Sequence, residues 1–129
     1  MALGDQIQVW RKGVYAHCGI DIGDGTVIHL TGDLKEKPGV SVKHTFIEDF
    51  RRDGVIEVIE PSDSLSSLVV VMRAIGQIGR TGYNLLDNNC EHFASWCKTG
   101  KSRSVQVNIL TIALLAIGIG GLLLLTSKS

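Results

Sequence analysis

The sequence predicts an α+β domain, in which a small antiparallel sheet packs against helices, followed by one C-terminal transmembrane helix. Three observations lead to this fold class. The first half of the chain carries short runs of alternating polar and apolar residues between glycine-containing turns. The second half has apolar residues at helical spacing. Residues 107–126 then form a run of 20 residues without a charged side chain. Strands followed by helices, in a chain of this length, are typical of one α+β core.

The expected sheet is made of short runs of alternating or β-branched residues, at positions 6–10, 16–22, 26–30, 40–43 and 55–60. The second and third runs flank Gly23-Asp24-Gly25, a strong turn signal, so they are expected to form a hairpin. Positions 17 and 29 of this hairpin can face the same side of the sheet without lying directly opposite each other.

Two helices are expected before Cys90, one between the strands at 40–43 and 55–60 and one after the last strand. The Thr45-x-x-Glu48 spacing is that of a capping box, which predicts a short helix ending near Arg52. Residues 64–78 predict a longer helix. Its apolar positions follow helical spacing and are expected to make one buried face: Leu65, Leu68, Val69, Met72, Ile75 and Ile78.

A third helix is expected to begin at Cys90 and to run to residue 98. Its apolar positions also fall at helical spacing: Phe93, Ala94, Trp96 and Cys97. Asn88 or Asn89 can cap its start, because an Asn side-chain oxygen accepts an unpaired N–H of the first turn. Gly100 suits its end, where a left-handed residue is needed. Cys90 therefore lies beside the positive end of the helix dipole, which favours a thiolate over a thiol.

These elements divide the chain into three parts. Residues 1–100 are expected to form the folded domain, residues 101–106 a basic linker, and residues 107–126 a membrane anchor. At a rise of about 1.5 Å per residue the last part spans about 30 Å, the thickness of a bilayer core. A fully buried core helix is the alternative, but so small a domain can hardly enclose one. The first residues lack the features of a signal peptide, so we expect a tail anchor.

Charge and cysteine usage bear on location and partners. Lys98, Lys101 and Arg103 precede the apolar run, which predicts that the domain faces the cytosol. Lys plus Arg equals Asp plus Glu, at 13 each, and no basic stripe suggests a nucleic-acid partner. The three cysteines are an odd number, and Cys90 and Cys97 lie too far apart on one helix to form a disulfide. Free thiols in a reducing compartment are therefore expected.

The candidate chemistry combines Cys90 with the upstream histidines His17 and His29. A thiolate can attack an ester, amide or thioester carbonyl, and an imidazole can return a proton to the leaving group. A third group that holds this imidazole in one tautomer completes such a unit. By itself a cysteine at a helix start is a weak signal, because cysteine is often a small buried apolar residue. Cys18 and Cys97 are expected to be such inert residues.

Three motifs strengthen this interpretation: Tyr15-Ala16-His17, the hairpin residues 20–30 that include His29, and Asn88-Asn89-Cys90-Glu91-His92-Phe93. Together they resemble the lecithin retinol acyltransferase-like family, and within it most closely the small phospholipase A/acyltransferases, also called HRAS-like suppressors. The resemblance covers nearly the whole chain. It implies a circularly permuted NlpC/papain-like thiol hydrolase fold and, at the C-terminus, one membrane span.

The resemblance also implies roles for these residues. Cys90 matches the nucleophile, His17 the general base and acid, and His29 the residue that orients His17. The implied enzyme is a phospholipase A1/A2 and O-/N-acyltransferase that takes an acyl group from a membrane phospholipid as a thioester. Water, the amine of phosphatidylethanolamine or a lysophospholipid then receives it, and no metal or cofactor is required.

The chain departs from the family pattern after the first histidine, where Cys18-Gly19 replace the usual Trp and a nearby aromatic residue. The pocket wall beside His17 is therefore expected to be smaller, with consequences for acyl or headgroup preference. Two other functions remain open on the residues alone. One is a cysteine isopeptidase or amidase of a related permuted fold, and the other is a non-catalytic, membrane-tethered interaction or remodelling protein.

Overall fold

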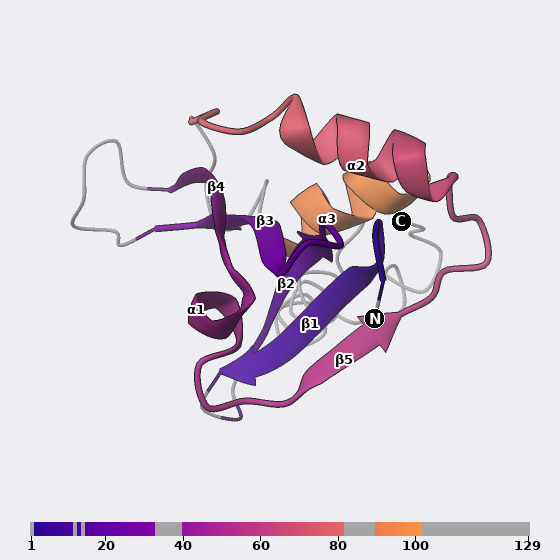
Figure 1. The fold of residues 1–129 in the computed structure, drawn as a ribbon. Coiled ribbons are helices and arrows are strands. Elements are labelled where there is room, and N and C mark those ends of the chain that lie inside the picture. Colours follow the sequence, from indigo (N-terminus) through magenta and orange to yellow (C-terminus); the bar gives the residue numbers. More distant parts are fainter. Residues whose placement is uncertain (1, 12, 14, 33–39, 82–89, 102–129) are drawn as a thin grey trace, which may run out of the picture.

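In a computed structural model of the chain, the described residues are 2–11, 13, 15–32, 40–81 and 90–101. They form a five-stranded antiparallel sheet with helices (Figure 1). The strands are β1 (Gln6–Arg11), β2 (Tyr15–Asp21), β3 (Thr26–Thr31), β4 (Ser41–Phe46) and β5 (Ile56–Ile59), and the helices are α1 (Ile47–Arg51), α2 (Ser67–Ile75) and α3 (Cys90–Thr99). The order in the sheet is β4-β3-β2-β1-β5. The α+β class predicted from the sequence is confirmed.

The expected transmembrane helix, residues 107–126, lies outside the described residues, as do the capping candidates Asn88 and Asn89. Among the helices that the structure describes, none has the length and apolar character to cross a membrane.

The predicted hairpin is present, and its turn is fixed by local hydrogen bonds. Gly23 and Gly25 both have φ 88°, a left-handed conformation that glycine adopts without strain. The Asp21 carboxylate accepts a hydrogen bond from the Gly23 N–H at 2.8 Å, and Asp24 accepts one from the Thr26 N–H at 3.0 Å. These bonds set the register in which β2 and β3 begin to pair.

The two hairpin strands separate soon after the turn. Their described pairing consists of Ile20 opposite Ile28 and Asp21 opposite Val27. Farther from the turn, β2 continues to pair with β1, and β3 continues to pair with β4. His17 and His29 lie beyond the paired positions, so their side chains are placed where the sheet opens.

Apolar side chains fill both faces of the sheet. On one face, α3 packs on β2 and β3, and α2 packs on α3 (Figure 1). The buried residues of this helical face are Cys18, Ile20, Ile28, Leu30, Val42, Val70, Ala74, Phe93, Ala94 and Cys97. A smaller cluster contains Ile7, Val9, Val27 and Phe50. Because side chains alternate along a strand, Val9 and Val27 point to the face opposite to Cys18 and Ile28.

Helix α3 agrees with its predicted start and apolar spacing. Phe93, Ala94 and Cys97 are buried. Gly100 follows the helix with φ 81°, and its N–H donates to the Trp96 carbonyl at 2.9 Å, so the predicted glycine stop is confirmed.

The predicted capping box is wrong. Thr45 belongs to β4, and α1 begins only at Ile47, with Phe46 in the cap position and no side-chain cap hydrogen bond. The reason is that the β3–β4 ladder extends to the pair of Thr26 and Phe46, so the chain is still extended at residue 45. The Thr45 hydroxyl is within 3.0 Å of His29 Nε2 instead.

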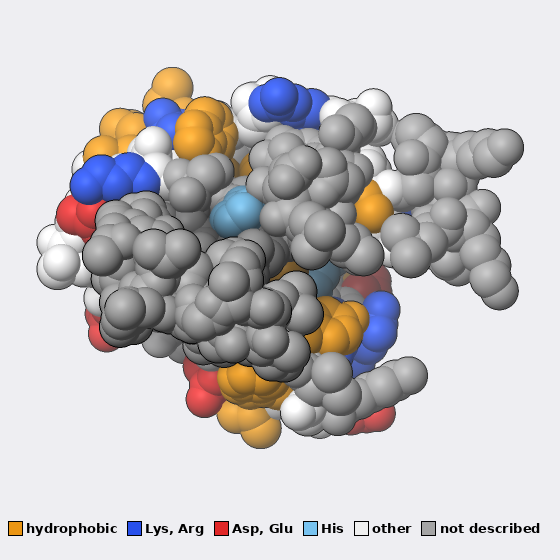
Figure 2. All heavy atoms as spheres, turned by 180° about the vertical axis from the view of Figure 1, so that it is seen from behind, with side chains coloured by type: hydrophobic (Ala, Val, Ile, Leu, Met, Phe, Trp, Pro, Cys, Tyr) orange, Lys and Arg blue, Asp and Glu red, His pale blue; other side chains and the backbone are white. Residues whose placement is uncertain are grey.

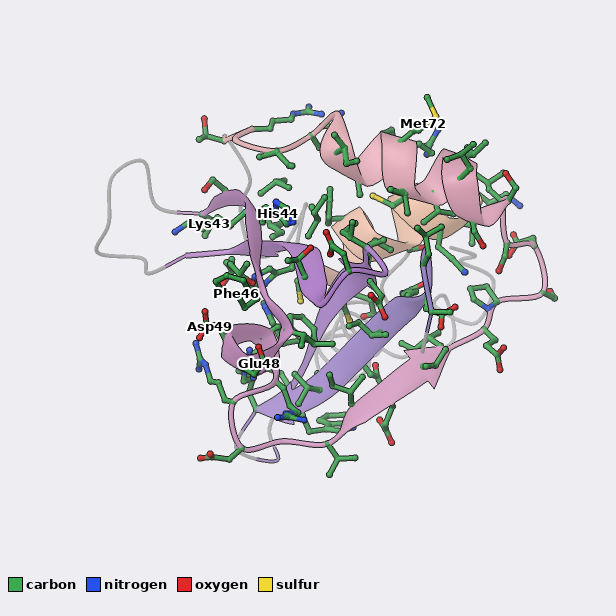
Figure 3. All side chains as sticks on the ribbon, in the orientation of Figure 1. Lys43, His44, Phe46, Glu48, Asp49 and Met72 are labelled. Atoms are coloured by element: carbon green, nitrogen blue, oxygen red, sulfur yellow. The ribbon has the colours of Figure 1, made fainter. Side chains whose placement is uncertain are left out.

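The predicted buried face of α2 is also wrong. Of the residues predicted to form it, Leu65 packs against the core on the helical face, but it precedes the first residue of α2. Leu68, Val69, Met72, Ile75 and Ile78 are 65, 42, 63, 51 and 44 % exposed. Met72 points away from the domain in Figure 3. The residues that α2 buries are Val70, Val71 and Ala74. These are smaller side chains, and small residues let two helices approach closely.

The two faces of α2 give a direct test on adjacent valines. Val70 is fully buried and Val69 is 42 % exposed. We expect Val70→Ala to lower the free energy of unfolding by about 1–3 kcal/mol, because it leaves a cavity under the helix. Val69→Ala should change it by less than about 0.5 kcal/mol. Urea unfolding of the full chain in detergent, followed by tryptophan fluorescence, measures both. A larger effect at Val69 would contradict the observed orientation of α2.

Candidate active site

The site is built around two imidazoles that meet across the opening between β2 and β3. His17 Nε2 lies 2.8 Å from His29 Nδ1, and both side chains are buried. The two residues come from different strands, and the separation of these strands leaves room for the rings. The sequence-based expectation that His17 and His29 share one side of the hairpin is met.

His29 is held at its other nitrogen by β4. Its Nε2 lies 3.0 Å from Thr45 Oγ1. Burial, together with the positive charge of His17, lowers the pKa of His29 to about 3. The ring is therefore neutral at physiological pH. A neutral His29 that donates from Nε2 to Thr45 can accept at Nδ1 the hydrogen bond of a protonated His17.

Phe50 forms the floor under both imidazoles. Its ring centroid lies 5.3 Å from that of His17 and 5.2 Å from that of His29, which it meets edge-on. Arg11 fixes this floor, because its guanidinium donates to the Phe50 carbonyl at 2.6 Å and lies over the Phe50 ring. The histidine pair is therefore supported by a rigid apolar surface rather than by solvent.

Gly19 is required by close packing on the same side. A Cβ at this position would lie 2.7 Å from Val27 Cγ1, 3.0 Å from the Phe50 ring and 3.1 Å from the His29 Cβ. Any side chain here would displace His29 or its floor. The glycine that follows Cys18 is therefore part of how His29 is positioned.

Cys90 reaches this site from the other sheet face, as the first residue of α3. Its Sγ lies 3.7 Å from the Ala16 carbonyl oxygen, next to His17 on β2. The Cys90 sulfur also interacts with the His17 side chain, and this interaction lowers the pKa of Cys90. Because His17 Nε2 is engaged with His29, Nδ1 is the ring nitrogen available to the sulfur. The structure thus brings all three predicted residues together.

The environment of Cys90 favours its thiolate. Its pKa lies well below the ordinary thiol value, first because the Cys18 thiol donates a hydrogen bond to it. The hydrogen bond and the charge of His17 act in the same direction, while burial opposes them. A thiolate beside an imidazolium that is oriented by a neutral histidine is the arrangement of an activated sulfur nucleophile.

Several of these contributions were not found in the sequence. The spacing around Thr45 predicts a helix cap, and no local pattern points to Arg11 or Phe50. Cys18 was expected to be inert, yet it is buried beside the nucleophile. Its position directly after His17 was the one available signal. As for metals, no cluster of three or more His, Cys, Asp or Glu side chains suited to an ion occurs within the described part of the chain.

Comparison with known proteins identifies the family. Residues 1–103 match the family model described as lecithin retinol acyltransferase. The chain belongs to this family. It is 35 % identical to lecithin retinol acyltransferase of Rattus norvegicus over an alignment of 131 positions, gaps included, that covers 80 % of this chain and 56 % of the rat protein. The lecithin retinol acyltransferase family resemblance predicted from the motifs is therefore confirmed.

Members named for phospholipase activity match more of their own length. The chain is 31 % identical to phospholipase A and acyltransferase 2 of Homo sapiens over an alignment of 150 positions, gaps included, that covers 98 % of this chain and 92 % of that protein. With human phospholipase A and acyltransferase 4 it shares 31 % identity, covering 81 % of this chain and 73 % of the relative. The chain spans little more than half of the lecithin retinol acyltransferases that it matches.

The hydrogen bonds to Cys90 predict its reactivity. We expect iodoacetamide to alkylate Cys90 with a pH midpoint below that of an ordinary thiol, since its pKa is lowered. His17→Gln and Cys18→Ala should each move this midpoint upward, by roughly one pH unit or more, because each removes a partner of the thiolate. Alkylation at each cysteine is followed by peptide mass spectrometry.

Cys97→Ala is the matched control for this measurement. Cys97 is fully buried, and burial raises its pKa to about 12, so its removal should leave the Cys90 profile unchanged. A Cys90 midpoint near that of free cysteine in the unsubstituted protein would contradict the thiolate assignment.

Proposed function

We propose that this protein is a thiol phospholipase A/acyltransferase, in which Cys90 takes an acyl group from a glycerophospholipid. The observation that carries the proposal is the continuous chain of contacts from the Cys90 sulfur through His17 and His29 to Thr45. Such a chain supplies a nucleophile, a proton carrier and two groups that hold the carrier in one tautomer. The names of the phospholipase A and acyltransferase relatives support the choice of a phospholipid.

In the first half of the cycle, the Cys90 thiolate attacks an ester carbonyl of the lipid. The carbonyl oxygen gains the negative charge, and the backbone N–H of Cys90 at the start of α3 is a candidate donor to it. The C–O bond to the glycerol then breaks. His17 gives its proton to the departing oxygen, so that a lysophospholipid leaves and an acyl-thioester remains on Cys90.

In the second half, His17 is neutral and accepts a proton from the incoming nucleophile. Water yields a free fatty acid, the amine of phosphatidylethanolamine yields an N-acylated lipid, and a lysophospholipid hydroxyl yields a new ester. The C–S bond breaks in each case, and the Cys90 thiolate and the protonated His17 are restored. His29 stays neutral throughout, because its lowered pKa prevents it from competing for the proton.

Lipid turnover by substituted proteins tests this cycle. The full chain is incubated with vesicles of phosphatidylcholine and phosphatidylethanolamine, and products are followed by mass spectrometry. We expect Cys90→Ala to lose at least roughly 1,000-fold in turnover, because the nucleophile is gone. Thr45→Val should lose about 3- to 10-fold, which corresponds to one hydrogen bond of about 0.5–1.5 kcal/mol.

Thr31→Val is the control for Thr45→Val, because it removes a hydroxyl from the neighbouring strand β3 and should leave turnover unchanged. No turnover of either lipid by the unsubstituted protein would reject the proposal. Cleavage of amide or isopeptide substrates instead would favour a cysteine amidase or isopeptidase. Absence of any turnover would favour a non-catalytic, membrane-tethered protein.

We also propose that the domain works at the bilayer in which residues 107–126 are anchored, with its site on the cytosolic side. The end of α3 lies against the start of the α2 segment, because the Leu65 N–H donates to the Lys98 carbonyl at 2.7 Å and Lys101 pairs with Asp63 at 3.3 Å. Residues 102–106 reach about 17 Å when fully extended. The proposed anchor would therefore begin within reach of α2.

The exposed face of α2 supports this arrangement. Leu68, Val69, Met72 and Ile75 form an apolar stripe along the helix, and Ile78 follows its end. Orange apolar side chains gather over α2 at the upper left of Figure 2. Exposed apolar patches of this kind are typical of interaction surfaces. A bilayer is the occupant that the nearby apolar run favours, since anchoring would hold α2 against the lipid.

A lipid-borne quencher tests the position of α2. Met72→Cys and, as control, Val55→Cys are made in a Cys90→Ala background, where the remaining cysteines Cys18 and Cys97 are fully buried. Both new positions are exposed, at 63 and 79 %. Each is labelled with a fluorophore in the full chain, reconstituted into vesicles that contain quencher-labelled lipid. We expect at least roughly threefold stronger quenching at position 72 than at position 55. Equal quenching, or none at position 72, would reject the assignment.

A further inference from the structure

A second thiol lies inside the site, beside the nucleophile. Cys18 is fully buried on β2, and its Sγ lies 3.9 Å from the Ala16 carbonyl oxygen. The Cys90 sulfur lies 3.7 Å from the same oxygen. Two sulfurs from residues 72 positions apart in the sequence therefore converge on one backbone atom. The proposed acyl transfer does not require a second sulfur.

The two thiols also contact each other, with opposite consequences. The interaction between the two sulfurs is the largest cause of both the lowered pKa of Cys90 and the raised pKa of Cys18. Cys90 is thus the charged, reactive member, while Cys18 keeps its proton. Cys97 is not part of the pair, because it lies seven residues farther along α3, about 10 Å away along the helix axis.

We propose that Cys90 and Cys18 form a hydroperoxide-reactive dithiol, in which Cys90 is oxidised first and Cys18 then closes an intramolecular disulfide. The convergence of both sulfurs on the Ala16 carbonyl carries this proposal. A thiolate with a protonated thiol in contact is the arrangement in which a sulfenic acid is converted to a disulfide before further oxidation. The expected substrates are hydrogen peroxide and organic hydroperoxides.

The chemistry balances with the hydroperoxide as the only oxidant. The Cys90 thiolate attacks the terminal peroxide oxygen and the O–O bond breaks. The departing alkoxide, or hydroxide from hydrogen peroxide, takes the proton of His17 and leaves as an alcohol or as water, and solvent returns a proton to His17. Cys90 is now a sulfenic acid and no longer carries a charge. The Cys18 sulfur attacks the Cys90 sulfur, the S–O bond breaks, and hydroxide leaves with the Cys18 proton as water. An external thiol reductant restores both thiols.

The first oxidation also prepares Cys18 for its step. The negative charge of Cys90 contributes to the raised pKa of Cys18. Loss of that charge in the sulfenic acid lowers the cost of deprotonating Cys18 and makes it a better nucleophile. The disulfide then protects Cys90 from irreversible oxidation to the sulfinic acid.

Peptide mapping of the oxidised full chain tests whether Cys18 and Cys90 form the proposed disulfide. The protein in detergent is treated with hydrogen peroxide, free thiols are blocked, and peptides are compared with and without reduction. We expect a Cys18–Cys90 linked peptide, absent after dithiothreitol, in the unsubstituted protein and in the matched control Cys97→Ala. In Cys18→Ala, sulfinic acid that dithiothreitol does not reverse should make up a share of the oxidised Cys90 that is at least roughly tenfold higher.

Absence of the linked peptide in the unsubstituted protein would overturn the proposal, and this readout needs no substituted protein to fold. An equal share of sulfinic acid in the oxidised Cys90 of the unsubstituted protein and of Cys18→Ala would also overturn the proposal. Disulfides that form only between two chains would overturn it as well. The dithiol proposal rests on the proposed function only through the Cys90 thiolate. Because the linked peptide is detected without a lipid substrate, its absence is distinguishable from a failure of the phospholipase proposal.

Discussion

The hydrogen bond between His17 and His29 depends on a sheet that opens at one point. Two antiparallel strands that remained paired would fill the space between them with backbone hydrogen bonds. Here β2 and β3 separate after two paired positions, and each finds a different neighbour for the rest of its length. Strand β1 still pairs with the outer edge of β2, and β4 with the outer edge of β3, so both strands stay in the sheet on either side of the opening. The imidazoles occupy it, and the first residue of α3 reaches it from the opposite face.

Much of this arrangement could be predicted from local patterns. A turn signal predicted the hairpin and helical spacing predicted the start of α3, while the motif resemblance to a family singled out His17, His29 and Cys90. The supporting residues could not be found in this way. Thr45 carries the spacing of a helix cap, and only the tertiary pairing of β4 with β3 makes it a partner of His29. Phe50 and Gly19 act through close packing, which no local pattern records.

The wrong prediction for α2 has a physical reason as well. Both faces of this helix are apolar, so periodicity alone does not identify the one that is buried. Val70, Val71 and Ala74 are shorter than Leu68, Met72 and Ile75, and they are the residues that pack. The larger residues were assigned to the core because large apolar side chains usually lie there. In this chain they lie on the surface.

The glycine turn of the hairpin has a consequence for the site as a whole. Side chains alternate along a strand, so a shift of one residue between β2 and β3 would point His29 to the other face and separate it from His17. The two paired positions next to the turn, together with the hydrogen bonds of Asp21 and Asp24, oppose such a shift. The geometry of the proton relay is therefore controlled by residues that touch neither the sulfur nor the imidazoles. Substitutions in the turn of this hairpin would therefore change the position of His29 relative to His17, and with it the reactivity of the site.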